Sequence, residues 1–243
     1  KQKREWARLN KISLKNGRKI LEFLNSFGKP VFIVPGNWDQ SLGKTAIKEM
    51  NKSGYNFGKS ALDYMWGEEI NKSLKKGLKN VYDCQFKLHK FNGINLVGYG
   101  NSNFPEKDML KRGKNKIENM RLKRAYSRIF ERIRKRYGRR EKQNSTIFLS
   151  HNVPFGTKLD VILNKDSPLH KKHYGSNIAR EFCKRYQPLI CIGGHIHEHF
   201  GKDKIGKTTV VNVGHGAYVN ILLEIKNNKI KKLEFWDGKE LYK

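Results

Sequence analysis

The chain has 243 residues and carries 51 lysines and arginines against 22 aspartates and glutamates, a formal net charge of +29 that attracts polyanions. A chain of this length can bury one sizeable core, and its six prolines, without a Gly/Ser linker or internal repeat, predict a single domain over 1–243. No run approaches the roughly 20 apolar residues of a membrane span, so we expect no membrane partner. Cys84, Cys183 and Cys191 lack Cys-x-x-C spacing and are expected to be reduced core residues of a cytoplasmic protein.

The first predicted elements are a helix over 12–27, with apolar residues at helical spacing, and an apolar strand over 31–34. The strand ends at a Pro-Gly break, and Asn37 and Asp39 follow it directly. Both residue types are common in turns for backbone reasons, so a metal site here needs partners elsewhere in the chain.

A hairpin and a basic helix are predicted next. Segments 84–91 and 94–100 alternate around Asn92-Gly93, which is a strong hairpin signal. The densely basic segment 107–142 contains an apolar stripe at helical spacing, which predicts a helix with lysines and arginines facing outward. This face is either an ordinary solvated surface or an arm that binds the phosphate backbone of nucleic acids.

The second half of the chain repeats the pattern of a strand ending in a polar residue. A strand over 146–149 delivers Ser150 and His151 to a loop. A helix then begins near Ser176, which either caps it or donates to a phosphate at the helix N-terminus, and ends at Pro188.

A third strand, over 189–192, is followed by a Gly-Gly pair and by histidines at alternate positions. His195 and His197 can point to one face, at the carboxyl end of a core strand, where α/β sheets bind ligands. His199 has no assigned role. Segment 208–236 predicts three more strands, and His215 between them is either a plain loop histidine or a proton donor near a metal. Three strand exits with potential ligands favour a metal site over an exposed polar loop.

Three short motifs occur in the order found in a known family. They are "GNWD" at 36–39, the isolated His151, and "GHIH" at 194–197. From about residue 31 to 214 the chain resembles the calcineurin-like metallophosphoesterase family, within a branch of small prokaryotic members. The resemblance implies an α/β fold, a sandwich of two β-sheets flanked by helices. The first βαβ portion is expected to be lacking, because the family's Asp-x-His and Gly-Asp motifs occur nowhere in these residues.

The family pattern also implies a metal centre and a reaction. It makes Asn37, His151 and His195 ligands of one divalent ion and His197 a ligand of a second ion. Imidazole and amide groups suit Mn, Fe, Zn or Ni. The implied activity is hydrolysis of phosphodiesters or phosphomonoesters by a metal-bound hydroxide.

Two departures from the family pattern qualify these expectations. The missing motifs indicate either an N-terminally truncated enzyme or a natural pseudo-enzyme, and we expect this chain alone to hold at most one metal weakly and to be inactive. Trp38 stands where many members have a proton-donating histidine, which favours diesters over monoesters. Its indole either packs beside the metals or stacks on the substrate. Two alternatives stay open: a nuclease of the same fold, if the basic segment faces the metal cleft, and a catalytically inactive, nucleic-acid-binding relic.

Overall fold

The computed structural model describes residues 2–36, 74–100, 116–198, 200–237 and 241–242. Their helices and strands follow one another in this order: α1 (Gln2–Ser26), β1 (Val31–Ile33), β2 (Val81–Asp83), β3 (Leu88–Phe91), β4 (Ile94–Tyr99), α6 (Lys116–Tyr137), β5 (Ser145–Asn152), α7 (Asn177–Tyr186), β6 (Ile190–Gly194), β7 (Gly201–Ile205), β8 (Thr208–Asn212), β9 (Val219–Lys226), β10 (Lys229–Asp237) and β11 (Leu241–Tyr242). None of the described helices is long and apolar enough to cross a membrane.

A six-stranded sheet with the order β3-β4-β5-β6-β8-β7 lies at the centre of the fold. Strands β4, β5, β6 and β8 are parallel, and β3 and β7 pair antiparallel at the two edges. A two-stranded parallel sheet of β1 and β2 and a three-stranded sheet of β11, β10 and β9 accompany it. The fold is therefore α/β, as predicted, and the carboxyl ends of four parallel strands share one edge.

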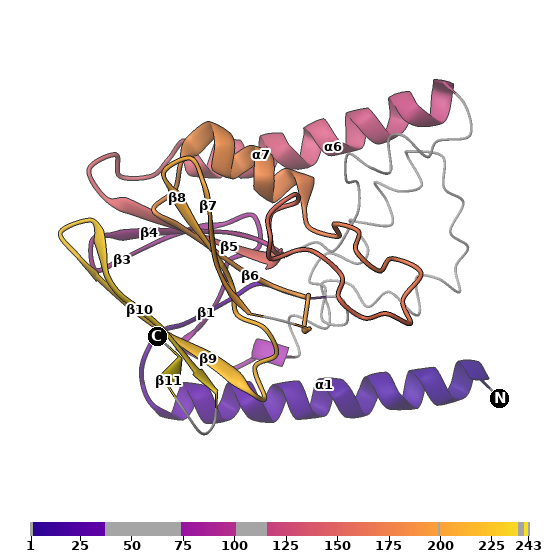
Figure 1. The fold of residues 1–243 in the computed structure, drawn as a ribbon. Coiled ribbons are helices and arrows are strands. Elements are labelled where there is room, and N and C mark those ends of the chain that lie inside the picture. The colour runs from indigo at the N-terminus through magenta and orange to yellow at the C-terminus, as the bar shows by residue number, and fades with distance from the viewer. Residues whose placement is uncertain (1, 37–73, 101–115, 199, 238–240, 243) are drawn as a thin grey trace.

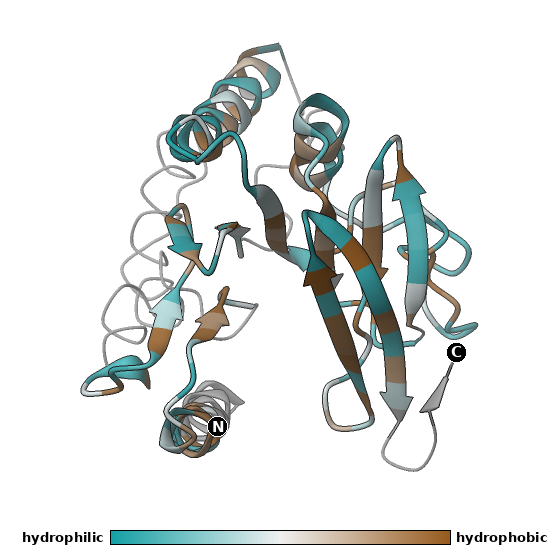
Figure 2. Ribbon diagram, turned by 90° about the vertical axis from the view of Figure 1, so that its left-hand side faces the viewer, coloured by the Kyte–Doolittle hydropathy of each residue, from teal (hydrophilic) through white to brown (hydrophobic). Residues whose placement is uncertain are grey.

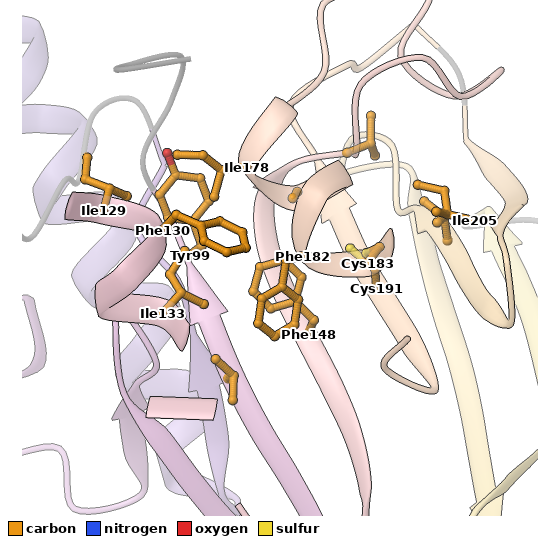
Figure 3. Packing of buried hydrophobic residues seen from close by; sticks show 14 of the residues in the cluster. Tyr99, Ile129, Phe130, Ile133, Phe148, Ile178, Phe182, Cys183, Cys191 and Ile205 are labelled. Atoms are coloured by element: carbon orange, nitrogen blue, oxygen red, sulfur yellow. The ribbon is translucent and has the colours of Figure 1, made fainter. Parts of the chain in front are cut away.

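Helices α6 and α7 cover one face of the central sheet, and the β9–β10 hairpin covers the other. In Figure 1 the two helices lie together on one side of the strands and α1 lies on the opposite side. On the helix face, Phe148 of β5 stacks on Phe182 of α7 with ring centroids 4.1 Å apart (Figure 3). On the other face, Val211 of β8 packs in a cluster with Val219 and Phe235. Two apolar cores thus flank the sheet, and Figure 2 shows several strands that are largely hydrophobic beside others that are hydrophilic or mixed.

The predicted stripe of the basic segment is buried in α6 as expected. Its apolar side chains are all at most 9 % exposed: Leu122, Tyr126, Ile129, Ile133 and Tyr137. Arg124, Arg128 and Lys135 are exposed on the opposite face of the helix. This basic face therefore points away from the sheet that α6 covers.

Several element boundaries differ from the sequence prediction. The predicted helix over 12–27 is the end of a longer helix, α1, that begins at Gln2. The Gly193-Gly194 pair belongs to β6 and does not open a loop, because Gly193 pairs with Asn212 and Gly194 with Asn152. A Cβ atom on Gly193 would come within 2.9 Å of the Val153 backbone, so this close pairing requires glycine.

The predicted Asn92-Gly93 hairpin is confirmed. Strands β3 and β4 pair antiparallel around it, and the two turn residues have φ angles of 46° and 71°. A two-residue hairpin turn of type I′ requires a positive φ at both of its central residues. The three cysteines are free and buried, as expected; Cys183 and Cys191 lie side by side in Figure 3, and burial raises the pKa of the Cys191 thiol.

Candidate metal centre

Two of the predicted ligands meet at the carboxyl edge of the central sheet. His151 lies near the end of β5, inside the strand and not in the loop after it, while His195 follows β6 directly. Because β5 and β6 are parallel neighbours, their ends lie side by side. His151 Nε2 is 3.0 Å from His195 Nδ1, and the ring centroids are 4.8 Å apart with an interplanar angle of 67°. We call these two residues the first histidine pair.

The first histidine pair fits a divalent metal ion. The 3.0 Å contact is a hydrogen bond between the two rings, and two nitrogens bound to one ion at about 2.1 Å lie at a similar separation of roughly 3.0–3.4 Å, depending on the coordination geometry. Burial lowers the pKa of His151 to about 4, and the neighbouring His195 and His197 contribute to the same shift. Burial and then His197 lower the pKa of His195 in the same direction. Both rings are therefore neutral near pH 7, which is the form that binds metals.

A second histidine pair consists of His197, two residues after His195, and His215, which lies beyond β8. The rings of His197 and His215 have centroids 4.8 Å apart and an interplanar angle of 71°. Burial lowers the pKa of His197, and His215 adds to this effect. The structure therefore arranges His151, His195, His197 and His215 in two pairs. Among the described residues, no three His, Cys, Asp or Glu side chains converge as a complete metal-binding group.

The side chain of Asn212, at the end of β8, joins the loops that carry both pairs. Its Nδ2 donates to the carbonyl of Ile196, between His195 and His197, at 3.0 Å. Its Oδ1 accepts from the N–H of Gly214, next to His215, at 3.0 Å. Asn212 is fully buried. The sequence analysis did not identify Asn212. The feature that could have indicated it is a polar side chain at the end of the apolar strand sequence "TVVN".

Asp160 organises the long loop between β5 and α7 beside the first pair. Its buried carboxylate accepts the backbone N–H groups of Gly156, Thr157 and Gly175 at 2.9–3.0 Å, and contacts His173 Nδ1 at 2.7 Å. We call residues 153–176 the Asp160 loop. The sequence pattern did not single out Asp160, because its partners lie up to 15 residues away.

Glu198, in the segment after β6 that carries His195 and His197, connects that segment to the Asp160 loop. Its carboxylate accepts the backbone N–H of Leu163 and, at 2.8 Å, that of Asn164. The carboxylate next to His197 is thus engaged as a support for the loop. Ser176 is also a structural residue here: it is buried, its side chain accepts from Ala179 N, and it caps α7. Of the two roles predicted for Ser176, the structure confirms the cap, and its role in phosphate binding stays a prediction.

The remaining predicted site residues, Asn37 and Trp38, lie outside the described residues. The described chain reaches Gly36, just before them. A Cβ atom on Gly100, just past the end of β4, would collide with Pro35, so the exits of β1 and β4 lie in close contact. Because β4 runs parallel to β5, this contact brings the start of the "GNWD" segment to the sheet edge where His151 lies.

The chain is similar to known proteins in sequence and in fold. The family model of the calcineurin-like phosphoesterases matches residues 14–199. An uncharacterised protein of Methanocaldococcus jannaschii is 31 % identical over 148 residues, which is 59 % of this chain and 58 % of that protein. The chain thus matches little more than half the length of this relative.

Solved structures give the same result for the fold. A crystal structure of a Thermus thermophilus protein has a TM-score of 0.50 at 16 % identity, covering 92 % of this chain and 79 % of the other. Another crystal structure has a TM-score of 0.52 at 14 % identity, covering 98 % of this chain and 74 % of the other. At these identities the likeness concerns the fold alone.

Proposed function

The chain belongs to the calcineurin-like phosphoesterase family, a family of metal-dependent phosphoester hydrolases, and we propose that with its metals bound it hydrolyses phosphodiesters ahead of phosphomonoesters. The observation that carries the proposal is the first histidine pair, whose nitrogens lie 3.0 Å apart at the carboxyl edge of the parallel strands. This is where α/β sheets place their ligands. Residues 1–243 act as one domain in this proposal.

The chain's own residues hold and orient the metals. His151 and His195, together with Asn37, would bind one ion, and His197 would bind its neighbour. Neutral imidazole is a suitable ligand for Mn, Fe, Zn or Ni. When bound, such ions activate water for attack and stabilise the charge on the phosphoryl oxygens. The buried Asn212 and Asp160 keep the ligand-bearing loops in place before any metal arrives.

The preference for diesters rests on Trp38. An indole cannot transfer a proton to the leaving group, and general acid catalysis is worth about 10²–10⁴-fold. Substrates with good leaving groups lose least from its absence. The flat ring is suited to stack on a base or an aromatic leaving group of the substrate.

We further propose that residues 1–243 alone hold these metals too weakly for turnover, so that the activity proposed above requires a site completed by anionic ligands. The described residues place no carboxylate ligand with either histidine pair, and a site without an anionic ligand neutralises the charge of its metal poorly. The sequence motifs that supply such carboxylates in the family are Asp-x-His and Gly-Asp. A protein extended by upstream residues that carry these motifs is expected to be active.

The basic face of α6 supports a second, separate proposal: binding of nucleic acid. Arg124, Arg128 and Lys135 occupy one exposed face at helical spacing. Because this face points away from the sheet, nucleic acid would bind there without entering the metal centre. Such a contact would concentrate the enzyme on nucleic acid, and it equally fits the inactive relic.

The experiment compares metal-dependent hydrolysis of a nitrophenyl phosphodiester by the upstream-extended protein and its variants, with Mn added. His151→Ala and His195→Ala should each abolish turnover. His89→Gln is the matched control, because His89 lies on edge strand β3, away from both histidine pairs, and its Nε2 contacts the backbone carbonyl of Asp83 at 2.9 Å. Full activity in both site variants would refute the metal assignment.

A further inference from the structure

We propose that His215 is a metal ligand that binds the second ion together with His197. This inference rests on the proposed function, because it concerns the same centre, and it goes further by assigning a ligand that the sequence motifs do not contain. It also changes the expected stoichiometry of this chain from at most one ion to two, each held by one histidine pair.

The first support is that the two pairs have the same ring geometry. Both have centroids 4.8 Å apart, with interplanar angles of 67° for His151 and His195 and 71° for His197 and His215. In the first pair this arrangement puts two nitrogens 3.0 Å apart, the separation that one ion requires. Two rings placed in the same way are a suitable chelating pair for a second ion.

The second support is an unsatisfied nitrogen. His215 Nδ1 is buried and has no hydrogen-bond partner among the described residues. Buried polar groups in proteins are nearly always hydrogen-bonded, so an exception calls for an explanation, and a role in binding an ion is one of them. An ion bound between the two rings supplies the partner that the described part of the chain does not.

The third support is that the backbone holds His215 in position. Its carbonyl accepts the N–H groups of Tyr218 at 2.8 Å and Val219 at 3.0 Å, which closes a turn at the start of β9. The Tyr218 ring lies 5.1 Å from the imidazole. Asn212 ties this turn to the loop of His197 through Gly214 and Ile196. The two rings are therefore brought together before binding, which increases metal affinity.

The donor set determines which ions bind. Two imidazoles without a carboxylate favour borderline ions such as Zn and Ni over Mg or Ca, which prefer oxygen ligands. The family pattern would add Asn37 to the first pair, so we expect the second site to be the weaker of the two. Zn is a suitable probe because it is diamagnetic and leaves imidazole nitrogen signals visible.

The test isolates the second pair in the 243-residue chain. The double variant His151→Ala/His195→Ala removes the first pair, and Zn is titrated while imidazole ¹⁵N shifts are recorded by NMR. We expect nitrogens of His197 and His215 to shift together with one common Kd. Adding His215→Ala should weaken the Zn response of His197 by roughly tenfold or more. A response of His197 that is unchanged without His215 would overturn the assignment.

A second variant avoids dependence on the folding of the double variant. In the otherwise intact chain, His215→Gln should lower the number of Zn ions bound from two to one by calorimetry, while His89→Gln should leave it at two. One ion in both the parent and His215→Gln would overturn the inference. The proposed function has a separate readout: if His151→Ala in the intact chain leaves both Zn ions bound, the first site fails, whatever His215 does.

Discussion

The Asp160 loop and the two histidine pairs are neighbours, yet they treat polar groups in opposite ways. In the loop, the buried carboxylate of Asp160 is surrounded by donors from Gly156, Thr157 and Gly175. In the pairs, the rings meet edge to face, and His215 Nδ1 is buried without a partner among the described residues. A buried group with all its hydrogen bonds made stabilises the fold, whereas an unsatisfied nitrogen such as that of His215 indicates a place for a ligand.

The two regions share a feature of the backbone. His195 has a φ angle of 73°, a left-handed conformation that is uncommon for a residue with a side chain. Within the Asp160 loop, Gly156 takes up a positive φ of 70°. The loop also holds Lys171 at a φ of 62°, so a left-handed residue with a side chain occurs in both regions, and at His195 it coincides with a predicted metal ligand. Strain of this kind is typical of functional sites.

The largest expected effect is on the stability of the Asp160 loop. Asp160→Ala leaves three backbone N–H groups without their acceptor, and the free energy of unfolding should fall by about 3 kcal/mol. Asp160→Asn keeps one acceptor oxygen and should lose less. Urea unfolding in EDTA measures both. A loss below about 1 kcal/mol for Asp160→Ala would show that the loop does not depend on its carboxylate.

The next effect is the dependence of the free energy of unfolding on pH that His151 of the first pair contributes. Burial lowers the pKa of His151 from 6.5 to about 4. Between these values the unfolded chain binds a proton there that the folded protein does not, so the metal-free protein loses stability as the pH falls through this window. His151→Gln should remove about 3 kcal/mol of that loss. Identical pH profiles for the parent and the variant would contradict the burial of a neutral His151.

A smaller change in stability is expected from removing the strain of the left-handed backbone conformation at His195. His195→Gly and His195→Ala both remove the metal ligand, but only glycine adopts the left-handed conformation without strain. We expect His195→Gly to be more stable than His195→Ala by about 1 kcal/mol in thermal unfolding without metal. Equal stabilities would mean that the loop rearranges around alanine.

The smallest effect is expected on the basic face of α6. Its side chains are exposed, and we expect them to contribute little to the stability of the Asp160 loop or of the histidine pairs. Reversing the charges of Arg124, Arg128 and Lys135 should change the free energy of unfolding by less than about 0.5 kcal/mol. If this face binds nucleic acid, the reversal should also flatten the log–log dependence of affinity on salt by about 0.7–0.9 per lost phosphate contact. An unchanged slope would return this face to an ordinary solvated surface.

Those features that depend on local spacing could be predicted from the sequence. Alternation and strand ends were enough to place His151 and His195 at one edge of the sheet, and the Asn92-Gly93 turn followed from residue type. Asp160 and Asn212 could not be found in this way, because their roles depend on partners brought close only by the fold, such as Leu159, 53 residues from Asn212. The place of His215 beside His197 likewise depends on the pairing of β6 with β8.

The amide of Asn212 also has a mechanical consequence. One side chain contacts the loop of the first pair through Ile196, the turn of His215 through Gly214, and the Asp160 loop through the carbonyl of Leu159 at 3.3 Å. A displacement of any one loop would therefore reach the other two, and we expect ion binding at one proposed site to be coupled to binding at the other. Substitutions at this position would tune how strongly each ion is held while every ligand stays unchanged.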